Sequence, residues 1–272
     1  MILVLAGLFG ALIGSFLNVC IARWPADGSV LSPPRSQCPN CGHEIRWYEN
    51  IPVVSWIALR AKCAGCQHAI SIQYPLVELA NAALWVVAFW GFGPTFTALR
   101  FAVFATLMLG IAVSDARYYI IADGFTVPGF FWVLVTAFVA AVLGDASPFA
   151  GPVEALYGAC VGAGAIAIVG WLGEVAFKRE AMGFGDVTLM AVCGAALGPP
   201  LVLLNVFIAA LLGAVVSLLV VAPIGWVRAR RAGTAFAVPH VPFGTFLAPA
   251  ALVTLLWGRS IIDRYVSLVL GG

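Results

Sequence analysis

Two acidic residues at the ends of apolar stretches are the side chains best placed to do chemistry. Asp115 closes one stretch, and Asp186 follows Gly183-Phe184-Gly185 at the start of another. A carboxylate beside hydrocarbon costs about 2.5 to 3.5 kcal/mol on insertion scales, so an acid in this position indicates a functional site. When two acids share a site, one can deprotonate water while the other protonates a carbonyl, as in aspartic proteases. Such hydrolysis needs no metal, serine nucleophile or histidine base, and we expect Asp186 to be a water-activating acid.

The glycines that precede Asp186 are predicted to support the site. Gly183 and Gly185 would let the backbone approach a substrate closely at a helix entrance. The N-terminus of the following helix would favour the ionised form of the acid. A plainer interpretation stays open, because Asp is among the best helix N-caps and Asp186 stands just before an apolar helix.

The first acid also has alternatives. Asp115 could be a polar helix end that forms a salt bridge with Arg117. Asp123 is its competitor for the catalytic role and is otherwise expected to be a supporting residue, although it too could cap the helix that begins at Phe125. Three glutamates near span ends are expected to extend toward water rather than react: Glu78, Glu154 and Glu174.

Four cysteines predict a metal site. Cys38-Pro-Asn-Cys41 and Cys63-Ala-Gly-Cys66 are two C-x-x-C knuckles separated by 21 residues. Four thiolates in a tetrahedral arrangement suit structural zinc, and a cytoplasmic location disfavours disulfides. A redox dithiol and a disulfide pair are the alternatives.

Other potential ligands are expected to be secondary. His43 and His68 each stand two residues after a knuckle and could substitute as ligands, but four cysteines already complete the shell. The remaining cysteines lie in apolar segments and are expected to be inert core residues: Cys20, Cys160 and Cys193.

Composition places the chain in the membrane. Of its 272 residues, 62% are apolar and 10% are charged, and the mean hydropathy is +1.04. A soluble domain would carry roughly a quarter charged residues. The net charge of +2 is too small to indicate a nucleic-acid partner. We therefore predict an all-α polytopic membrane protein whose environment is a lipid bilayer.

Apolar windows predict about eight transmembrane helices. The sixth is too short to span alone, but residues 187–227 suit two passes that turn at Gly198-Pro199-Pro200. The short helix would place Asp186 below the lipid headgroups. The predicted spans are 1–20, 76–92, 99–113, 125–143, 155–177, 187–197, 201–226 and 243–257.

Basic residues predict the orientation. Eleven of the fourteen Lys and Arg residues fall on one side, which we assign to the cytoplasm together with both aspartates. Both termini are then outside. No basic region precedes the first apolar run, so we expect residues 1–22 to be a retained first helix rather than a cleaved signal. Residues 23–74 form a cytoplasmic zinc-binding insert, and residues 75–272 a seven-helix domain that carries the aspartates.

These residues resemble the type IV prepilin leader peptidase and N-methyltransferase family over nearly the whole chain. Around Asp115 and Asp186 lie segments similar to the family's two aspartate motifs. Its opening signature and insert are matched by Gly14-Ser15-Phe16-Leu17-Asn18-Val19, Arg23-Trp24-Pro25, Pro33-Pro34-Arg35-Ser36, Ile45-Arg46-Trp47-Tyr48, Asn50-Ile51-Pro52 and Tyr74-Pro75-Leu76-Val77-Glu78.

The resemblance implies the substrate and the cofactor. Asp115 and Asp186 would be the catalytic dyad of a peptidase that cuts the basic leader of a prepilin or type II secretion pseudopilin after glycine. Cleavage would occur at the cytoplasmic face of the bacterial inner membrane. The same enzyme would then methylate the new N-terminal amine with S-adenosylmethionine, and the insert 23–74 would belong to the methylating domain.

Three positions depart from the family pattern. Thr188 stands where lysine is common, Ala122 where proline usually precedes the second acid of the first motif, and Ala61 where glycine often stands before the second knuckle.

Functions of other classes stay open. A presenilin-like intramembrane aspartic protease without methyltransferase activity would share the dyad but would not need a four-cysteine insert. An aspartate-dependent, ion-coupled transporter would predict a midplane site with broken helices or repeats. A membrane scaffold could bind a partner through its zinc domain while both aspartates cap helices.

Overall fold

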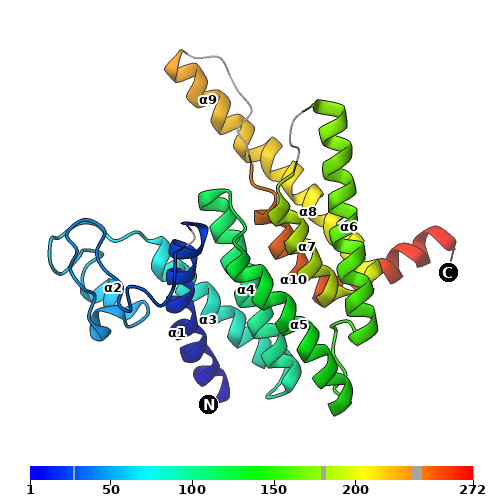
Figure 1. Cartoon of the computed structure of the whole chain (residues 1–272), viewed down its shortest axis with the longest axis horizontal. Coiled ribbons are helices and arrows are strands. Elements are labelled where there is room, and N and C mark those ends of the chain that lie inside the picture. The colour runs from blue at the N-terminus through cyan, green and yellow to red at the C-terminus, as the bar shows by residue number, and fades with distance from the viewer. Residues whose placement is uncertain (27, 179–181, 234–240, 272) are drawn as a thin grey trace. The chain divides into compact units, whose positions relative to one another are not determined.

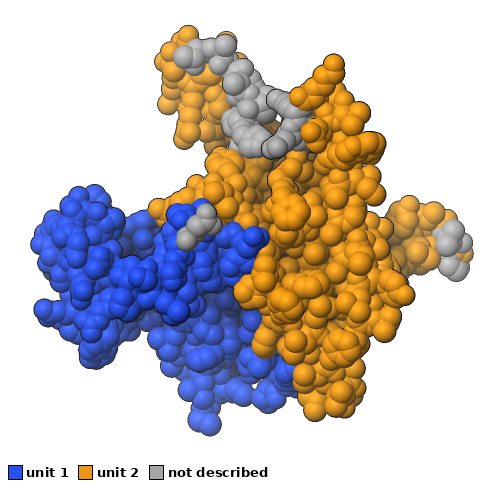
Figure 2. All heavy atoms as spheres, viewed as in Figure 1, with its two compact units in different colours: residues 1–110, 122–125 blue, residues 111–121, 126–272 orange. Residues whose placement is uncertain are grey.

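The computed structural model describes residues 1–26, 28–178, 182–233 and 241–271 (Figure 1). Over these ranges the chain is helical and has no β-strand, as the sequence predicts; its only β-type pairings there are two isolated bridges. The chain divides into two compact units (Figure 2). Unit 1 comprises residues 1–110 and 122–125, and unit 2 comprises residues 111–121 and 126–272.

Seven helical stretches in the described ranges are long and apolar enough to cross a membrane. An eighth apolar helix, α7 (Phe184–Leu197), has 14 residues, or about 21 Å at 1.5 Å per residue, against roughly 30 Å of hydrocarbon. This confirms the predicted short helix. The long stretches are α1 (Ile2–Arg23), α3 (Gln73–Phe92), α4 (Phe96–Tyr118), α5 (Asp123–Leu143), α6 (Pro152–Phe177), α8 (Pro199–Val216) with its continuation through α9 (Ala222–Ala232), and α10 (Gly244–Leu270).

Helix ends differ from the hydropathy windows where polar residues continue a helix. The window over α4 ends at Val113, but the helix runs on to Tyr118 and therefore contains Asp115. The window over α10 ends at Trp257, whereas the helix continues to Leu270. Hydropathy detects the apolar part of a helix, and charged residues can prolong it without breaking backbone hydrogen bonds.

In unit 1, helices α1 and α3 pack side by side because α1 presents glycines to its neighbour (Figure 1). A Cβ on Gly10 would lie 2.8 Å from Trp85 Cβ, and one on Gly14 would lie 2.8 Å from Glu78 Cα. The buried Asn81 side chain donates to the Gly10 carbonyl at 2.7 Å. Small residues and interhelical hydrogen bonds of this kind hold helices together where lipid removes the hydrophobic driving force.

In unit 2, α7 is the central helix and packs against α6, α8 and α10. Its residues from Leu189 to Leu197 are almost completely buried. The closest approach is to α6, where Gly158 and Gly194 face each other so closely that a Cβ on either would overlap the other's backbone. Gly198, at φ +79°, makes the predicted turn from α7 into α8.

Candidate active site and four-cysteine cluster

Asp115 lies in the last turn of α4 and is buried, with 5% of its surface exposed. Its Oδ2 accepts the backbone N–H of Thr245 at 2.8 Å and lies 3.4 Å from the Thr245 hydroxyl. Thr245 belongs to the first turn of α10, 130 residues away in sequence. The ring of Tyr118 contacts the Arg117 guanidinium, whose central carbon is 5.1 Å from the ring centroid. Asp115 is thus a buried acid anchored by another helix.

Asp186 lies in the first turn of α7 and is half-buried. The N-cap of α7 is Gly183, so Asp186 is not the N-cap residue. Its Oδ2 lies near Gly183, 3.9 Å from where a Cβ on that glycine would stand. The carboxyl groups of Asp115 and Asp186 lie near enough for their charges to interact. The end of α4 and the start of α7, both in unit 2, therefore bring the two carboxyl groups together.

Ile121 lies between the elements that carry the site. A Cβ on Gly185 would stand 2.9 Å from Ile121 Cβ, and a Cβ on Gly244 would stand 2.6 Å from Ile121 Cδ1. Gly185 therefore allows the start of α7 to approach the segment that follows Asp115. The Thr188 hydroxyl donates to the Gly185 carbonyl at 3.0 Å, so this departure from the family pattern closes the first turn of α7.

The predicted supporting acid stands at the start of a helix. Asp123 is the first residue of α5, is exposed, and belongs to unit 1. Two residues that no sequence motif points to, Gly244 and Thr245, lie against Asp115. Their only signal is a Gly-Thr pair at the start of an apolar stretch, and it does not indicate which acid they meet.

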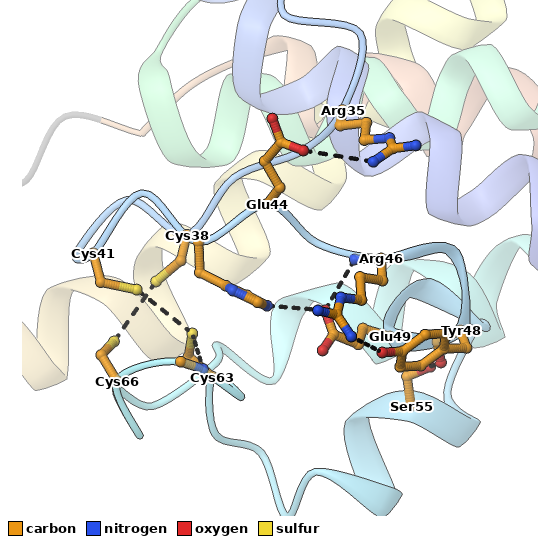
Figure 3. Close-up of polar contacts among 12 residues, drawn as sticks. Arg35, Cys38, Cys41, Glu44, Arg46, Tyr48, Glu49, Ser55, Cys63 and Cys66 are labelled. Carbon is orange, nitrogen blue, oxygen red and sulfur yellow. Dashed lines mark hydrogen bonds and ion pairs between the residues drawn. The ribbon is translucent and has the colours of Figure 1, made fainter.

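The four knuckle cysteines converge, as predicted from their spacing (Figure 3). Their sulfur atoms all lie within 4.8 Å of one another, and the Sγ–Sγ distances Cys38–Cys66 and Cys41–Cys63 are both 3.9 Å. Sulfurs bound at about 2.3 Å to a tetrahedral zinc would stand about 3.8 Å apart. All seven cysteines are free thiols. The cluster therefore has the geometry to hold a metal ion.

The two knuckles repeat the same backbone fold. Cys38 N–H donates to the His43 carbonyl at 2.9 Å, and Cys63 N–H donates to the His68 carbonyl at 2.8 Å. The residue after each second cysteine is left-handed, with φ +71° at Gly42 and +61° at Gln67. In each knuckle the backbone carbonyl of the histidine accepts the N–H of the first cysteine. The cluster itself is formed by four sulfurs.

Polar side chains surround the cluster. His43 Nε2 lies 3.1 Å from Glu49 Oε2. The Arg46 backbone N–H, which donates to the same oxygen at 2.9 Å, lowers the pKa of Glu49. The Asn40 side-chain amide donates to the Cys66 sulfur at 3.4 Å, and this bond is the main cause that lowers the pKa of that thiol to about 6. A thiol that ionises this readily suits a metal ligand.

Glu78 does not extend toward water, as its place near a span end had suggested. It is 7% exposed, and its Oε2 accepts the Val53 backbone N–H at 2.7 Å. The Ser15 hydroxyl lies beside the same carboxylate. Because Val53 belongs to the insert and Ser15 to α1, Glu78 connects the insert to two membrane helices.

Comparison with known proteins gives the family. Residues 8–92 match the bacterial peptidase A24 N-terminal domain, and residues 102–218 match the type IV leader peptidase family. No solved structure matches the chain.

Three relatives share the name prepilin leader peptidase/N-methyltransferase. The protein of Pseudomonas aeruginosa is 34% identical over 281 residues, which cover 95% of this chain and 91% of the relative. That of Dichelobacter nodosus is 36% identical over 283 residues, with 94% and 91% covered. That of Myxococcus xanthus is 40% identical over 225 residues, with 83% and 65% covered. With both family matches and full-length similarity, this chain belongs to the type IV prepilin leader peptidase/N-methyltransferase family.

Proposed function

We propose that this protein is a membrane aspartic endopeptidase that removes the basic leader of prepilins or pseudopilins. The observation that supports this most is the meeting of Asp115 and Asp186, held by the end of α4 and the start of α7. One carboxylate takes a proton from water, and the water oxygen attacks the peptide carbonyl carbon. The other carboxyl group protonates the carbonyl oxygen, which gives a tetrahedral intermediate. As the intermediate collapses, the first acid gives its proton to the leaving nitrogen, the C–N bond breaks, and the second acid takes a proton back from a hydroxyl of the intermediate.

The position of the acids suits this substrate. A prepilin presents a polar leader joined to an apolar helix, so its scissile bond must be reached where water meets hydrocarbon. Asp115 and Asp186 are at helix ends, not in helix centres. From the excess of basic residues on one side, we place this face in the cytoplasm, at the inner membrane of a bacterium. Cleavage after glycine is the expected specificity of the family.

The insert of residues 23–74 is proposed to hold structural zinc. Four thiolates favour zinc, and the distances between their sulfurs fit tetrahedral coordination. Zinc, when bound, would link the two knuckles through Cys38, Cys41, Cys63 and Cys66. Methylation of the new N-terminal amine with S-adenosylmethionine is proposed from the name that the relatives share.

The dyad is tested by isosteric replacement. Asp115→Asn and Asp186→Asn should each lower the cleavage rate of a prepilin by about 10²- to 10⁴-fold, the usual contribution of a general acid or base. The exposed Asp263 of α10 provides a matched control, and Asp263→Asn should cleave normally. Cleavage is followed by mass spectrometry with purified full-length protein in detergent. Normal processing by either dyad variant would refute the assignment.

A further inference from the structure

The two acids of the proposed dyad are anchored in different ways. Asp186 makes its main-chain contact with Gly183, in its own helix start. The carboxylate of Asp115, by contrast, accepts the Thr245 N–H in the first turn of α10 and lies against Gly244. The position of Asp115 relative to Asp186 therefore depends on a third helix that contributes no acid to the site.

The first turn of α10 has N–H groups to offer. The first four N–H groups of a helix have no acceptor within it. Here the N–H groups of Phe246 and Leu247 donate to the Phe243 carbonyl at 2.9 and 3.1 Å. The Thr245 N–H instead donates to Asp115 Oδ2 at 2.8 Å. The positive end of the α10 dipole thus points at a buried carboxylate.

A glycine at position 244 is what allows this approach. Gly244 is buried, and a Cβ there would stand 2.8 Å from Asp115 Oδ2 and 2.6 Å from Ile121 Cδ1. Both distances are shorter than van der Waals contact, so any side chain would displace the carboxylate or the helix start. The Thr245 hydroxyl adds weaker contacts at 3.4 Å to Asp115 Oδ2 and to the Ala112 carbonyl.

We propose that Gly244 and Thr245 are positioning residues that fix the Asp115 carboxylate for catalysis. The proposal rests on the proposed function, because it concerns the same dyad. Reacting groups need near-attack geometry, and a displacement of about 1 Å can cost 10²-fold in rate. A disturbed α10 start should therefore lower kcat and leave the KM for prepilin little changed.

Hydrogen exchange tests the contact directly. In full-length protein in detergent, the Thr245 amide, followed in peptides that cover residues 241–247, should exchange at least tenfold faster in Asp115→Ala, because its N–H loses its acceptor. Asp186→Ala is the matched control and should exchange like the unaltered protein. Equal exchange in Asp115→Ala and the unaltered protein would overturn the proposal.

Kinetics test the consequence. Gly244→Ala should lower kcat at least tenfold with KM within twofold. Gly164→Ala, which places a methyl in open space on α6, should be unaffected. Thr245→Ser should keep kcat within twofold, whereas Thr245→Val should lower it severalfold. If Asp115→Asn and Asp186→Asn are inactive but Gly244→Ala cleaves normally, the positioning role fails alone; if Asp115→Asn is active, the dyad itself fails.

Discussion

Replacing Glu78 with alanine should loosen the four-cysteine insert from the membrane helices. The Val53 N–H···Oε2 bond is 2.7 Å long and partly buried, and hydrogen bonds to charged groups contribute about 1.5 to 3 kcal/mol. Val53 also has φ +63°, a conformation that a β-branched residue keeps only when its surroundings impose it. Because 1.4 kcal/mol is a factor of ten in an equilibrium constant, loss of this hydrogen bond corresponds to about 10- to 150-fold weaker protection of the Val53 amide from exchange.

Hydrogen exchange of peptides that cover residues 51–56 measures this protection in detergent. The Val53 exchange rate in Glu78→Gln should lie between the rates in the unaltered protein and in Glu78→Ala, because the glutamine amide oxygen still accepts the hydrogen bond but carries no charge. Glu44→Ala is the control within the same insert: Glu44 forms an exposed ion pair with Arg35 at 3.5 Å, worth at most about 1 kcal/mol. Val53 exchange within twofold of the unaltered protein in Glu78→Ala would refute the connecting role.

Three further predictions concern stability. Gly158→Ala should lower the unfolding temperature, because its Cβ would overlap Gly194 and overpacking costs about 1 to 3 kcal/mol, whereas Gly164→Ala on the same helix should not. Ala61→Gly should stabilise the insert by about 0.5 to 1 kcal/mol in thermal unfolding, since Ala61 has φ +58°; an unchanged midpoint would contradict this. Cys38→Ser should reduce bound zinc, measured by elemental analysis, and make the insert sensitive to protease; full zinc content would exclude the four-thiolate site.

Much of the fold follows from the apolar composition and from the glycine and proline residues that end helices. Long apolar runs predict membrane helices, because a helix makes all of its backbone hydrogen bonds within one segment and needs no water to do so in lipid. Gly198 with two prolines predicts the turn between α7 and α8, and the structure has it, with a left-handed glycine. Hydropathy places the C-terminal ends of α4 and α10 too early, because the apolar part of each helix ends before its backbone hydrogen bonding does. Asp115 consequently lies inside a helix rather than after one.

The four-cysteine cluster was predictable residue by residue, since each C-x-x-C knuckle is a local motif that brings its two sulfurs together. The contacts between helices were not predictable from the sequence. Residues that face lipid and residues that face the protein interior are both apolar, so they leave little periodic signal. Gly10 and Gly158 look alike in sequence, yet one meets α3 and the other α7. Glu78 was likewise misjudged from its place near a span end, because only the fold brings the Val53 N–H to it.

The meeting of helix ends gives a physical reason for where the acids stand. A helix start exposes N–H groups that lipid cannot satisfy, and a carboxylate at the membrane face needs donors that lipid cannot supply. At the start of α10 the Thr245 N–H donates to Asp115, and at the start of α7 Asp186 lies near Gly183. At the start of α10, the helix N–H group gains an acceptor and the carboxylate gains a donor in the same hydrogen bond. Asp115 can therefore stay buried beside hydrocarbon, provided that glycine at 244 lets the start of α10 approach it.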